Sequence, residues 1–481
     1  MFVQKITLHP NLNNLKNLLA TSGFTQQQKN YLQDFILRYN ERTKTSKHIS
    51  QSSRPFLADD KNLGEFNLLF KEMYYPIVAN RSSGSKIWDV DGNEYVDVMM
   101  GLGINLFGHN PPFIKEALIA QLDQGIQIGP QSEIVGEVAE LISQLTGMER
   151  VCFSNTGTEA VMTAIRIARA VTGRNKIVIF SGSYHGHFDG TLVNKNNAEN
   201  NQYAIPLAPG ILQNFVNDVL VLDYGNPKSL EIIKAYHQEL AAVLVVPVQT
   251  ARPALQPKEF LQELRKLTQA SNIALIFDEM VTGFRIHPGG AQAYFGVQAD
   301  IATYGKIVGG GIPIGVIAGN SKYMNVIDGG VWNYGDDSYP QTKKTFFAGT
   351  FCKHPLAMAA AKAVLKYLQS QDPSLHQKLN ERTIQFVMAL NNYFVIERLP
   401  LRMANFGSLF GSASVELAEE NSTLSVVMSL LKYHLIHKGV HLLGVSGYLS
   451  TAHTDEDINY ILQAVKDSVE ELRYGGFIPF Y

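Results

Sequence analysis

The sequence contains only two cysteines, Cys152 and Cys352, among its 481 residues. Two thiols so far apart in the chain cannot build a disulfide framework or a thiolate metal cluster, so we interpret them as free thiols in a reducing compartment. No apolar stretch approaches the ~20 residues that cross a bilayer, and the first residues lack the basic start and apolar centre of a secretory signal. We therefore expect a cytoplasmic protein with no membrane partner.

The chain also lacks an excess of charge of either sign, with 41 basic and 43 acidic residues. No basic run interleaved with aromatic residues appears, so there is no net field to attract nucleic acid or anionic lipid. We expect no nucleic-acid partner. A chain of this length exceeds the size at which one core stays compact, which predicts two or three packed units.

Short apolar runs alternate with helical patterns in the middle of the chain. Continuous apolar strands separated by helices predict an α/β fold in which a mainly parallel sheet is covered on both faces. Ligands of such sheets bind at the carboxyl ends of the strands. The predicted strands are Val151–Phe153, Lys176–Phe180, Ala242–Val246, Ala274–Phe277 and Ile314–Ala318, with helices at Thr158–Val171 and Pro257–Ala270.

The two ends of the chain predict a smaller α+β domain. Residues 1–65 are polar, with one helix from Thr25 to about Tyr39, and are expected to form an arm or linker. A hairpin follows around Asp91-Gly92-Asn93, and an alanine-rich helix spans Pro355–Leu368. We expect the N-terminal part of the small domain at 66–120, a large domain at 121–350, and the C-terminal part of the small domain at 351–481.

Asp278 and Lys306 carry the strongest functional signal. Asp278 ends the apolar run Ile273–Phe277, and Lys306 lies between Gly305 and the glycines 309–311. A buried carboxylate needs a cationic partner, and the protonated ring nitrogen of pyridoxal phosphate (PLP) supplies one. A lysine amine bonds to the PLP aldehyde, and it later moves the proton at the substrate α-carbon. The alternatives are a solvated turn and a surface lysine, while isoleucine after Lys306 excludes a Walker motif.

A strand followed by a glycine and a helix predicts a phosphate site. Residues 154–160 read Ser-Asn-Thr-Gly-Thr-Glu-Ala, and they open the first predicted helix. Free amides and the positive end of the helix dipole bind anions, so Gly157 and Thr158 are the candidate phosphate ligands. The alternative is a helix that is simply capped by Thr156 or Thr158.

The loop after the strand that ends at Phe180 contains an aromatic residue and two histidines. Tyr184 is the candidate to stack on the flat cofactor ring. His185 and His187 have no acidic or cysteine partner at the spacing of metal ligands, so we expect no metal site. Structural roles, or roles at the edge of the cofactor, are favoured for both histidines.

Together and in this order, these segments resemble the class III aminotransferases, which are PLP enzymes of fold type I, and most closely the glutamate-1-semialdehyde aminomutase-like branch. The resemblance runs from about Phe66 to the C-terminus. It implies a homodimer in which Thr350 of the partner subunit contacts the cofactor phosphate, and pyridoxamine phosphate as the second form of the cofactor. The motifs that carry it are Asn155–Ala160, Tyr184–His187, Phe277–Arg285, Gly305–Gly311 and Phe347–Pro355.

Within that branch, four segments are similar to the aminotransferase domains of hybrid polyketide/nonribosomal peptide synthetases. Those domains convert a β-ketoacyl thioester on a carrier protein into a β-amino acyl thioester. The resemblance implies an amino acid donor, glutamate or glutamine, and an acyl carrier protein as partner, with residues 1–65 as the linker from an upstream carrier. The segments are Arg42–Lys47, Arg54-Pro55, Lys71–Val78 and Gly84–Tyr95.

Three other functions remain open at this point: a glutamate-1-semialdehyde 2,1-aminomutase of tetrapyrrole synthesis, a PLP decarboxylase or racemase, and a non-catalytic scaffold that keeps the fold. Many class III enzymes have a glutamate where this chain has Val246, directly before Pro247. This difference argues against an ordinary exchange between an α-amino acid and 2-oxoglutarate. Residues 194–218 are predicted to be a mobile loop over the site.

Overall fold

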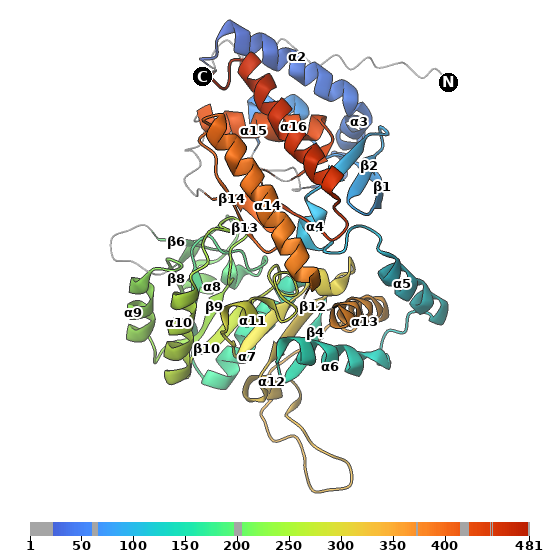
Figure 1. Ribbon diagram of the computed structural model, residues 1–481. Coiled ribbons are helices and arrows are strands. Elements are labelled where there is room, and N and C mark those ends of the chain that lie inside the picture. The colour runs from blue at the N-terminus through green and yellow to red at the C-terminus, as the bar shows by residue number, and fades with distance from the viewer. Residues whose placement is uncertain are drawn as a thin grey trace.

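The computed structural model describes residues 23–59, 66–196, 204–371, 374–413, 423–442, 444 and 446–479. Figure 1 shows a larger domain below and a smaller one above it, with helices drawn from both ends of the chain in the smaller domain. Two of the sequence predictions, the arm at 1–65 and the loop at 194–218, lie partly outside the described residues.

The large domain is built on a seven-stranded sheet. Every strand runs in the same direction except β12, which is antiparallel to both of its neighbours. The predicted α/β fold with a mainly parallel sheet is therefore confirmed, although the predicted strand at 314–318 is its one reversed member. The order is β4 (Arg150–Ser154), β12 (Gly315–Gly319), β11 (Ile301–Tyr304), β10 (Ala274–Asp278), β9 (Leu240–Val245), β5 (Lys176–Phe180) and β8 (Val219–Leu222).

Both faces of this sheet are buried, as the continuous apolar runs require. Alternate residues of β5, β9 and β10 point to opposite faces because side chains alternate along a strand. One face packs on helix α7 (Gly157–Thr172), and its residues are Ile177, Ile179, Ala242, Leu244, Ala274 and Ile276. The other face joins the main core through Val178, Phe180, Val243, Val245, Leu275 and Phe277.

The remaining helices of the large domain lie around this sheet, and a two-stranded ladder stands beside it. The helix predicted at 257–270 is α10 (Lys258–Ala270), and that predicted at 355–368 is α13 (Pro355–Ser370). The others are α5 (Pro112–Gln124), α6 (Ile134–Thr146), α8 (Gln213–Val216), α9 (Pro227–Ala235), α11 (Gly290–Phe295) and α12 (Ser321–Asp328), with short turns η2 (Asp189–Thr191) and η3 (Lys306–Gly309) and the ladder β6 (Val193–Lys195) with β7 (Ala204–Pro206).

The small domain joins the two ends of the chain in one sheet. The predicted hairpin at 87–97 is confirmed as β2 (Lys86–Asp89) and β3 (Glu94–Asp97), and β15 (Val440–His441) pairs with β3 in parallel. The further elements are η1 (Leu68–Met73), β1 (Ala79–Ser83), α4 (Met100–Gly103), α14 (Ser374–Ile396), α15 (Thr423–His437) and α16 (Asp455–Tyr474), with a second sheet of β13 (Met403–Phe406), β14 (Leu409–Ser412) and β16 (Gly447–Tyr448).

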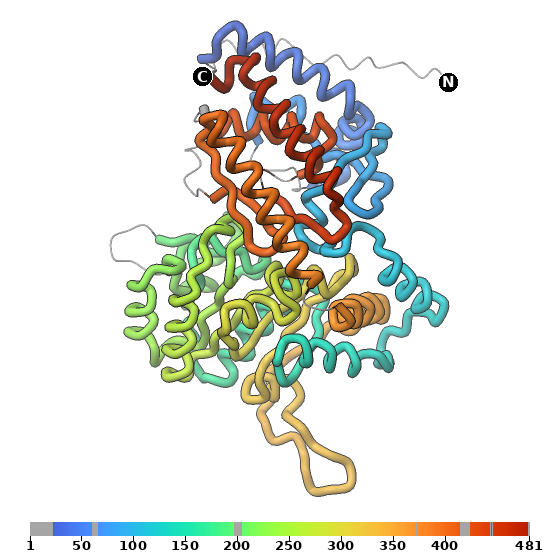
Figure 2. Tube along the Cα trace, viewed as in Figure 1, coloured from blue at the N-terminus to red at the C-terminus, as the bar shows by residue number. Residues whose placement is uncertain are grey.

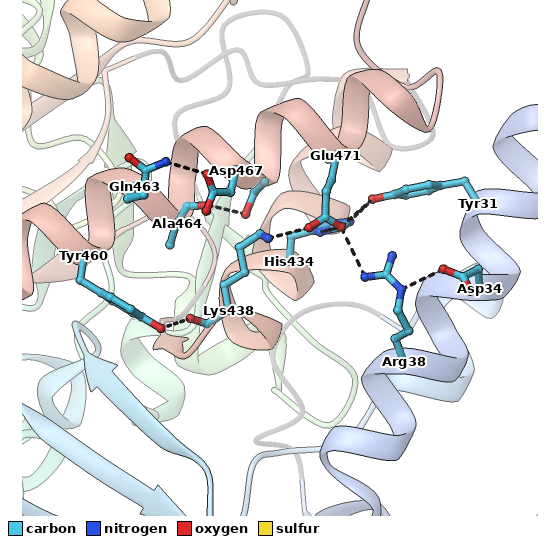
Figure 3. A network of polar contacts seen from close by, with 11 residues as sticks. Tyr31, Asp34, Arg38, His434, Lys438, Tyr460, Gln463, Ala464, Asp467 and Glu471 are labelled. Carbon is cyan, nitrogen blue, oxygen red and sulfur yellow. Dashed lines mark hydrogen bonds and ion pairs between the residues drawn. The ribbon is translucent and has the colours of Figure 1, made fainter.

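The N-terminal segment is folded onto this domain. Helix α2 (Gln26–Arg42), capped by Thr25, is followed by α3 (Lys44–Ser53). Figure 3 shows how α2 meets α15 and α16: Tyr31 lies 2.9 Å from His434, and Arg38 and Lys438 both pair with Glu471. The described part of the expected polar arm thus differs from a free linker, because α2 buries an apolar stripe of Leu32, Phe35, Ile36 and Tyr39.

A long segment between α12 and α13 projects away from the body of the large domain (Figure 2). It carries large apolar side chains that are exposed, among them Val331, Trp332, Tyr334, Tyr339 and Phe346. In the part of the chain that the structure describes, no helix is long and apolar enough to cross a membrane.

Candidate functional site

The structure places Asp278 at the end of one strand and Lys306 just after the neighbouring one. Asp278 is the last residue of β10 and is 3% exposed. Lys306 follows β11, which runs parallel beside β10, and it begins the short turn η3. Its backbone adopts φ 47°, a left-handed conformation that is uncommon for a residue other than glycine and that occurs preferentially at functional sites.

The Asp278 carboxylate is held by a histidine. His185 Nδ1 lies 2.7 Å from Asp278 Oδ2, and both side chains are buried. Asp278 Oδ1 accepts a weaker hydrogen bond from the backbone N–H of Met280 at 3.2 Å. Donation from Nδ1 to the carboxylate fixes the tautomer of the imidazole and keeps Asp278 in one orientation. The second ring nitrogen of His185, Nε2, is buried without a hydrogen-bond partner among the described residues.

The Lys306 amine lies in surroundings that disfavour its charge. Burial lowers the pKa of Lys306, the nearby Asp278 carboxylate opposes this shift, and the Arg285 guanidinium adds to it. A lower pKa increases the fraction of neutral amine, which is the form that can act as a nucleophile or accept a proton. The sequence predicted this pair, a buried Asp278 carboxylate and a nearby Lys306 amine.

The predicted phosphate loop opens helix α7. Thr156 is the N-cap and accepts a hydrogen bond from the backbone N–H of Glu159 at 3.2 Å. Thr158 Oγ1 accepts from the backbone N–H of His187 at 3.2 Å, so this loop and the Tyr184–His187 loop are in contact. A Cβ at Gly157 would lie 2.8 Å from Met280 Sδ, so a larger residue here would require the Met280 side chain to move.

Two predicted cofactor contacts lie on exposed surface. Tyr184, on the loop directly before the buried His185, is 71% exposed. Thr350 is exposed at the end of the projecting segment. Their roles in stacking on the ring and in binding the phosphate from a second subunit stay predictions.

Gln249 is a site residue that the sequence reasoning missed. It is buried four residues after the end of β9, and its Nε2 donates to Ser181 O at 2.9 Å and to Ser183 Oγ at 2.8 Å. Its Oε1 is buried and has no partner in the described structure. The sequence contained a signal for it, because Gln249 follows a buried strand at the same sheet edge as Asp278.

Two more buried charges beside Asp278 were not singled out from the sequence. Glu279 accepts hydrogen bonds from the backbone N–H groups of Ala291 and Gln292, and burial raises its pKa to about 7. Arg285 is fully buried, with its guanidinium 4.8 Å from the ring centre of Tyr448, and burial lowers its pKa to about 10. Both side chains support the segment that carries Asp278.

Comparison with known proteins identifies the family. The model of the family "Aminotransferase class-III" matches residues 70–463. The chain belongs to the class III aminotransferase family. A curated relative, the glutamate-1-semialdehyde 2,1-aminomutase of Alkaliphilus oremlandii (strain OhILAs), is 34% identical over 406 residues, which cover 83% of this chain and 92% of the relative. The predicted resemblance to class III and to its aminomutase-like branch is confirmed.

Solved structures of transaminases share the fold. An omega-transaminase from Sphaerobacter thermophilus superposes with a TM-score of 0.81 at 28% identity, covering 90% of this chain and 99% of the other. A β-phenylalanine aminotransferase from Variovorax paradoxus superposes with a TM-score of 0.79 at 26% identity, covering 94% and 99%. The predicted fold type I architecture, with a large and a small domain, is confirmed.

Class III aminotransferases use PLP, and the chain is a PLP-dependent aminotransferase by family. The residues present fit this cofactor. The edge of the sheet holds a buried acid, a lysine with a lowered pKa, and two buried polar atoms, His185 Nε2 and Gln249 Oε1, that have no partner among the described residues. Buried polar atoms are normally hydrogen-bonded in native proteins, so these two atoms indicate a polar group that binds here.

Proposed function

We propose that Lys306 and Asp278 are the catalytic pair of a PLP-dependent aminotransferase. The single observation that carries this proposal is the arrangement of two side chains: Lys306, with a lowered pKa, directly follows β11, and the buried Asp278 carboxylate, which His185 orients, ends the neighbouring β10. When bound, PLP supplies an electron sink for the charge that forms as a proton leaves the substrate. Asp278 keeps the ring nitrogen protonated, and the Lys306 amine moves the proton at the α-carbon.

The other predicted residues hold the cofactor in this proposal. Gly157 and Thr158 at the start of α7 bind the phosphate, and Tyr184 covers the ring. Thr350 of the partner subunit completes the phosphate site, which requires a homodimer. The contact between the phosphate loop and the Tyr184–His187 loop supports this assignment, because it brings both segments to one edge of the sheet.

For the substrates, we infer an amino acid donor, glutamate or glutamine, and a β-ketoacyl thioester on an acyl carrier protein as acceptor, with the protein in the cytoplasm. Two observations support this inference. The β-phenylalanine aminotransferase neighbour is named for a β-amino acid, and this chain matches it over 94% of its length. Val246 replaces the glutamate of many class III enzymes, and it is buried, with 8% exposed.

The curated relatives favour a second candidate function. Relatives from Alkaliphilus oremlandii and from Chloroflexus aggregans, 34% and 33% identical, are both named glutamate-1-semialdehyde 2,1-aminomutase. These names support the isomerase more directly than the name of the β-phenylalanine aminotransferase supports the carrier-protein reaction. The same Lys306 and Asp278 would serve both reactions, so the residues of the catalytic pair do not separate the two functions.

A spectroscopic half-reaction separates them. The PLP-loaded protein is mixed with single amino acids, and the absorbance of the bound cofactor reports its conversion to pyridoxamine phosphate. Conversion by glutamate or glutamine, followed by reversal when a β-ketoacyl carrier-protein thioester is added, is the expected result. If no amino acid converts the cofactor and glutamate semialdehyde is isomerised without a donor, the aminomutase function is correct.

A further inference from the structure

Arg252 lies in the loop between β9 and α10, at the same sheet edge as the catalytic pair. The strands β10, β9 and β5 are neighbours and parallel, so the segments that follow them meet at one edge. Asp278 ends β10, the Tyr184–His187 loop follows β5, and the loop with Arg252 follows β9. A side chain on the β9 loop is therefore placed between the two elements that carry Asp278 and His185.

The Arg252 guanidinium lies next to Gly182, just before the Tyr184–His187 loop. A Cβ added at Gly182 would lie 3.3 Å from both Cζ and Nη2 of Arg252, and 3.3 Å from Gln249 Oε1. Gly182 precedes Tyr184 by two residues and His185 by three. A side chain at Gly182 would therefore crowd the Arg252 guanidinium.

The Arg252 guanidinium has no negatively charged partner among the described residues. The Arg252 side chain is partly buried, and it forms no ion pair or side-chain hydrogen bond with any residue that the structure describes. Val246, three residues before Gln249 in the same loop, is apolar and offers the guanidinium no acceptor. A guanidinium presents a planar set of N–H donors that matches the two oxygens of a carboxylate. A partly buried guanidinium without a partner is therefore available to bind a carboxylate of a ligand.

The loop that holds Arg252 is fixed between the two domains. Gln256 Nε2 donates to Asn405 O of β13 at 3.0 Å, which ties this loop to the small domain. The backbone N–H of Arg252 donates to Gln249 O at 2.9 Å. Arg252 is thus held where the small domain covers the carboxyl ends of the strands, which is where a substrate beside the cofactor has to enter.

We propose that Arg252 binds a carboxylate of the amino donor and favours glutamate as that donor. This inference rests on the proposed function, because it assumes a donor amino acid beside the cofactor. Arg252 takes no part in proton transfer. In the first half of the reaction it holds the carboxylate of the amino acid, and it releases the same group with the 2-oxo acid product.

Glutarate tests the inference without turnover, because it has both carboxylates of glutamate but no amine to react. Calorimetric titration of the PLP-loaded protein with glutarate is compared for wild type, Arg252→Gln and the control Lys258→Gln, which removes an exposed charge at the start of α10. We expect glutarate to bind at least about tenfold more weakly to Arg252→Gln, with wild-type affinity in Lys258→Gln and unchanged cofactor content. Arg252→Lys, which keeps the charge without the planar set of N–H donors, is expected to be intermediate.

Equal glutarate affinity in wild type and Arg252→Gln, or no glutarate binding by wild type, overturns the inference. The neutral diamide glutaramide is expected to bind both proteins equally. In the half-reaction, Arg252→Gln is expected to raise the glutamate concentration that gives half of the maximal conversion rate. The maximal rate itself should stay nearly unchanged. If no amino acid converts the cofactor but glutarate binding still depends on Arg252, the aminotransferase proposal fails while the carboxylate site stands.

Discussion

At the scale of single residues, Lys306 combines a strained backbone with a buried amine. Its φ of 47° and its lowered pKa both cost stability, and such features persist only where the surrounding structure holds them in place. Here the two neighbouring parallel strands β10 and β11 fix the position of the lysine relative to Asp278. The strain and the desolvation are consistent with a residue that the site needs in one place and in its neutral form.

Replacing this lysine should remove catalysis and leave the fold intact. We expect Lys306→Ala to lose at least about 10³-fold in the rate of cofactor conversion by a donor amino acid, because acid–base catalysis alone contributes about 10²- to 10⁴-fold. Stopped-flow absorbance measures this rate. Lys322→Ala, at an exposed lysine on α12, is the control and should keep the wild-type rate. A Lys306→Ala protein that converts the cofactor at a normal rate would exclude the proposed role.

His185 should control cofactor affinity through Asp278. We expect His185→Leu to weaken PLP binding about 10- to 100-fold, because a buried carboxylate that loses a hydrogen-bond donor costs about 1–3 kcal/mol. Equilibrium dialysis measures the Kd for PLP. His187→Leu changes an exposed histidine two residues away and should bind PLP nearly as wild type does. Similar losses in both variants would mean that the effect comes from the loop and not from the contact with Asp278.

Some residues of the candidate site could be predicted from their neighbours in the sequence, and others could not. Lys306 and Asp278 could be predicted because glycines and an apolar strand surround them in the sequence. The partnership of His185 with Asp278 could not, since it joins β5 to β10 across the intervening β9, and strand order is not visible in the sequence. The position of Arg252 next to Gly182 depends on the same order of strands.

At the scale of elements, helix α2 was predicted correctly as a helix, but its packing on the small domain was not. Its capping box at Thr25 and its length were predictable from the sequence. Its packing was not, because most of its residues are polar and its partners α15 and α16 lie about 400 residues further along the chain. Phe35 stacks on His434 with ring centres 3.8 Å apart, so the helix is part of the small domain.

The packing of α2 predicts that substitutions on its two faces change the free energy of unfolding by different amounts. We expect Phe35→Ala to lower the free energy of unfolding by about 3–5 kcal/mol, because it removes a fully buried ring. Leu37→Ala, two residues away and 45% exposed, should cost less than about 1 kcal/mol. Urea unfolding monitored by circular dichroism measures both. Equal costs would show that α2 does not pack on α15 in solution.

The sheet that joins the two ends of the chain contains an acid-sensitive carboxylate. Asp97 at the end of β3 accepts from His109 Nε2 at 2.7 Å and from His441 Nδ1 at 2.8 Å. Burial alone would raise the pKa of Asp97, but the two histidines outweigh it and hold this pKa well below its usual range. Because the unfolded chain then binds more protons than the folded one, Asp97 contributes stability above its unfolded pKa of about 4, and this stability is lost as the pH falls further.

We therefore expect the wild-type free energy of unfolding to fall on acidification below about pH 4, and to fall less steeply in Asp97→Asn. The variant should also be less stable at pH 7, because it loses charge-assisted hydrogen bonds from both histidines. Urea unfolding at a series of pH values tests this. Asp123→Asn, at an exposed position of α5, is the control and should follow the wild-type curve. Parallel curves for Asp97→Asn and wild type would contradict the prediction.

At the scale of the whole molecule, the segment between α12 and α13 has the composition of an interface. Trp332 is 41% exposed, and Tyr334 is 92% exposed, while the segment projects from the large domain (Figure 2). Apolar side chains gathered on a projecting segment are costly in water and are typical of surfaces that a second chain covers. Thr350 lies at the end of this segment, so a subunit that packs there brings Thr350 toward the other subunit.

Mixed dimers decide whether Thr350 acts across the interface. Lys306→Ala and Thr350→Asp each disable every site in their own homodimers, the second because a carboxylate repels the cofactor phosphate. In a heterodimer of the two, the subunit with an intact Lys306 receives the intact Thr350 of the partner subunit, so one site is complete. If Thr350 served its own subunit, neither site would be complete.

Co-expression of the two variants in equal amounts should therefore restore about a quarter of the wild-type rate, since half of the randomly formed dimers are mixed and each has one working site. No recovery, with mixed dimers verified by mass spectrometry, would show that Thr350 does not complete the partner's site.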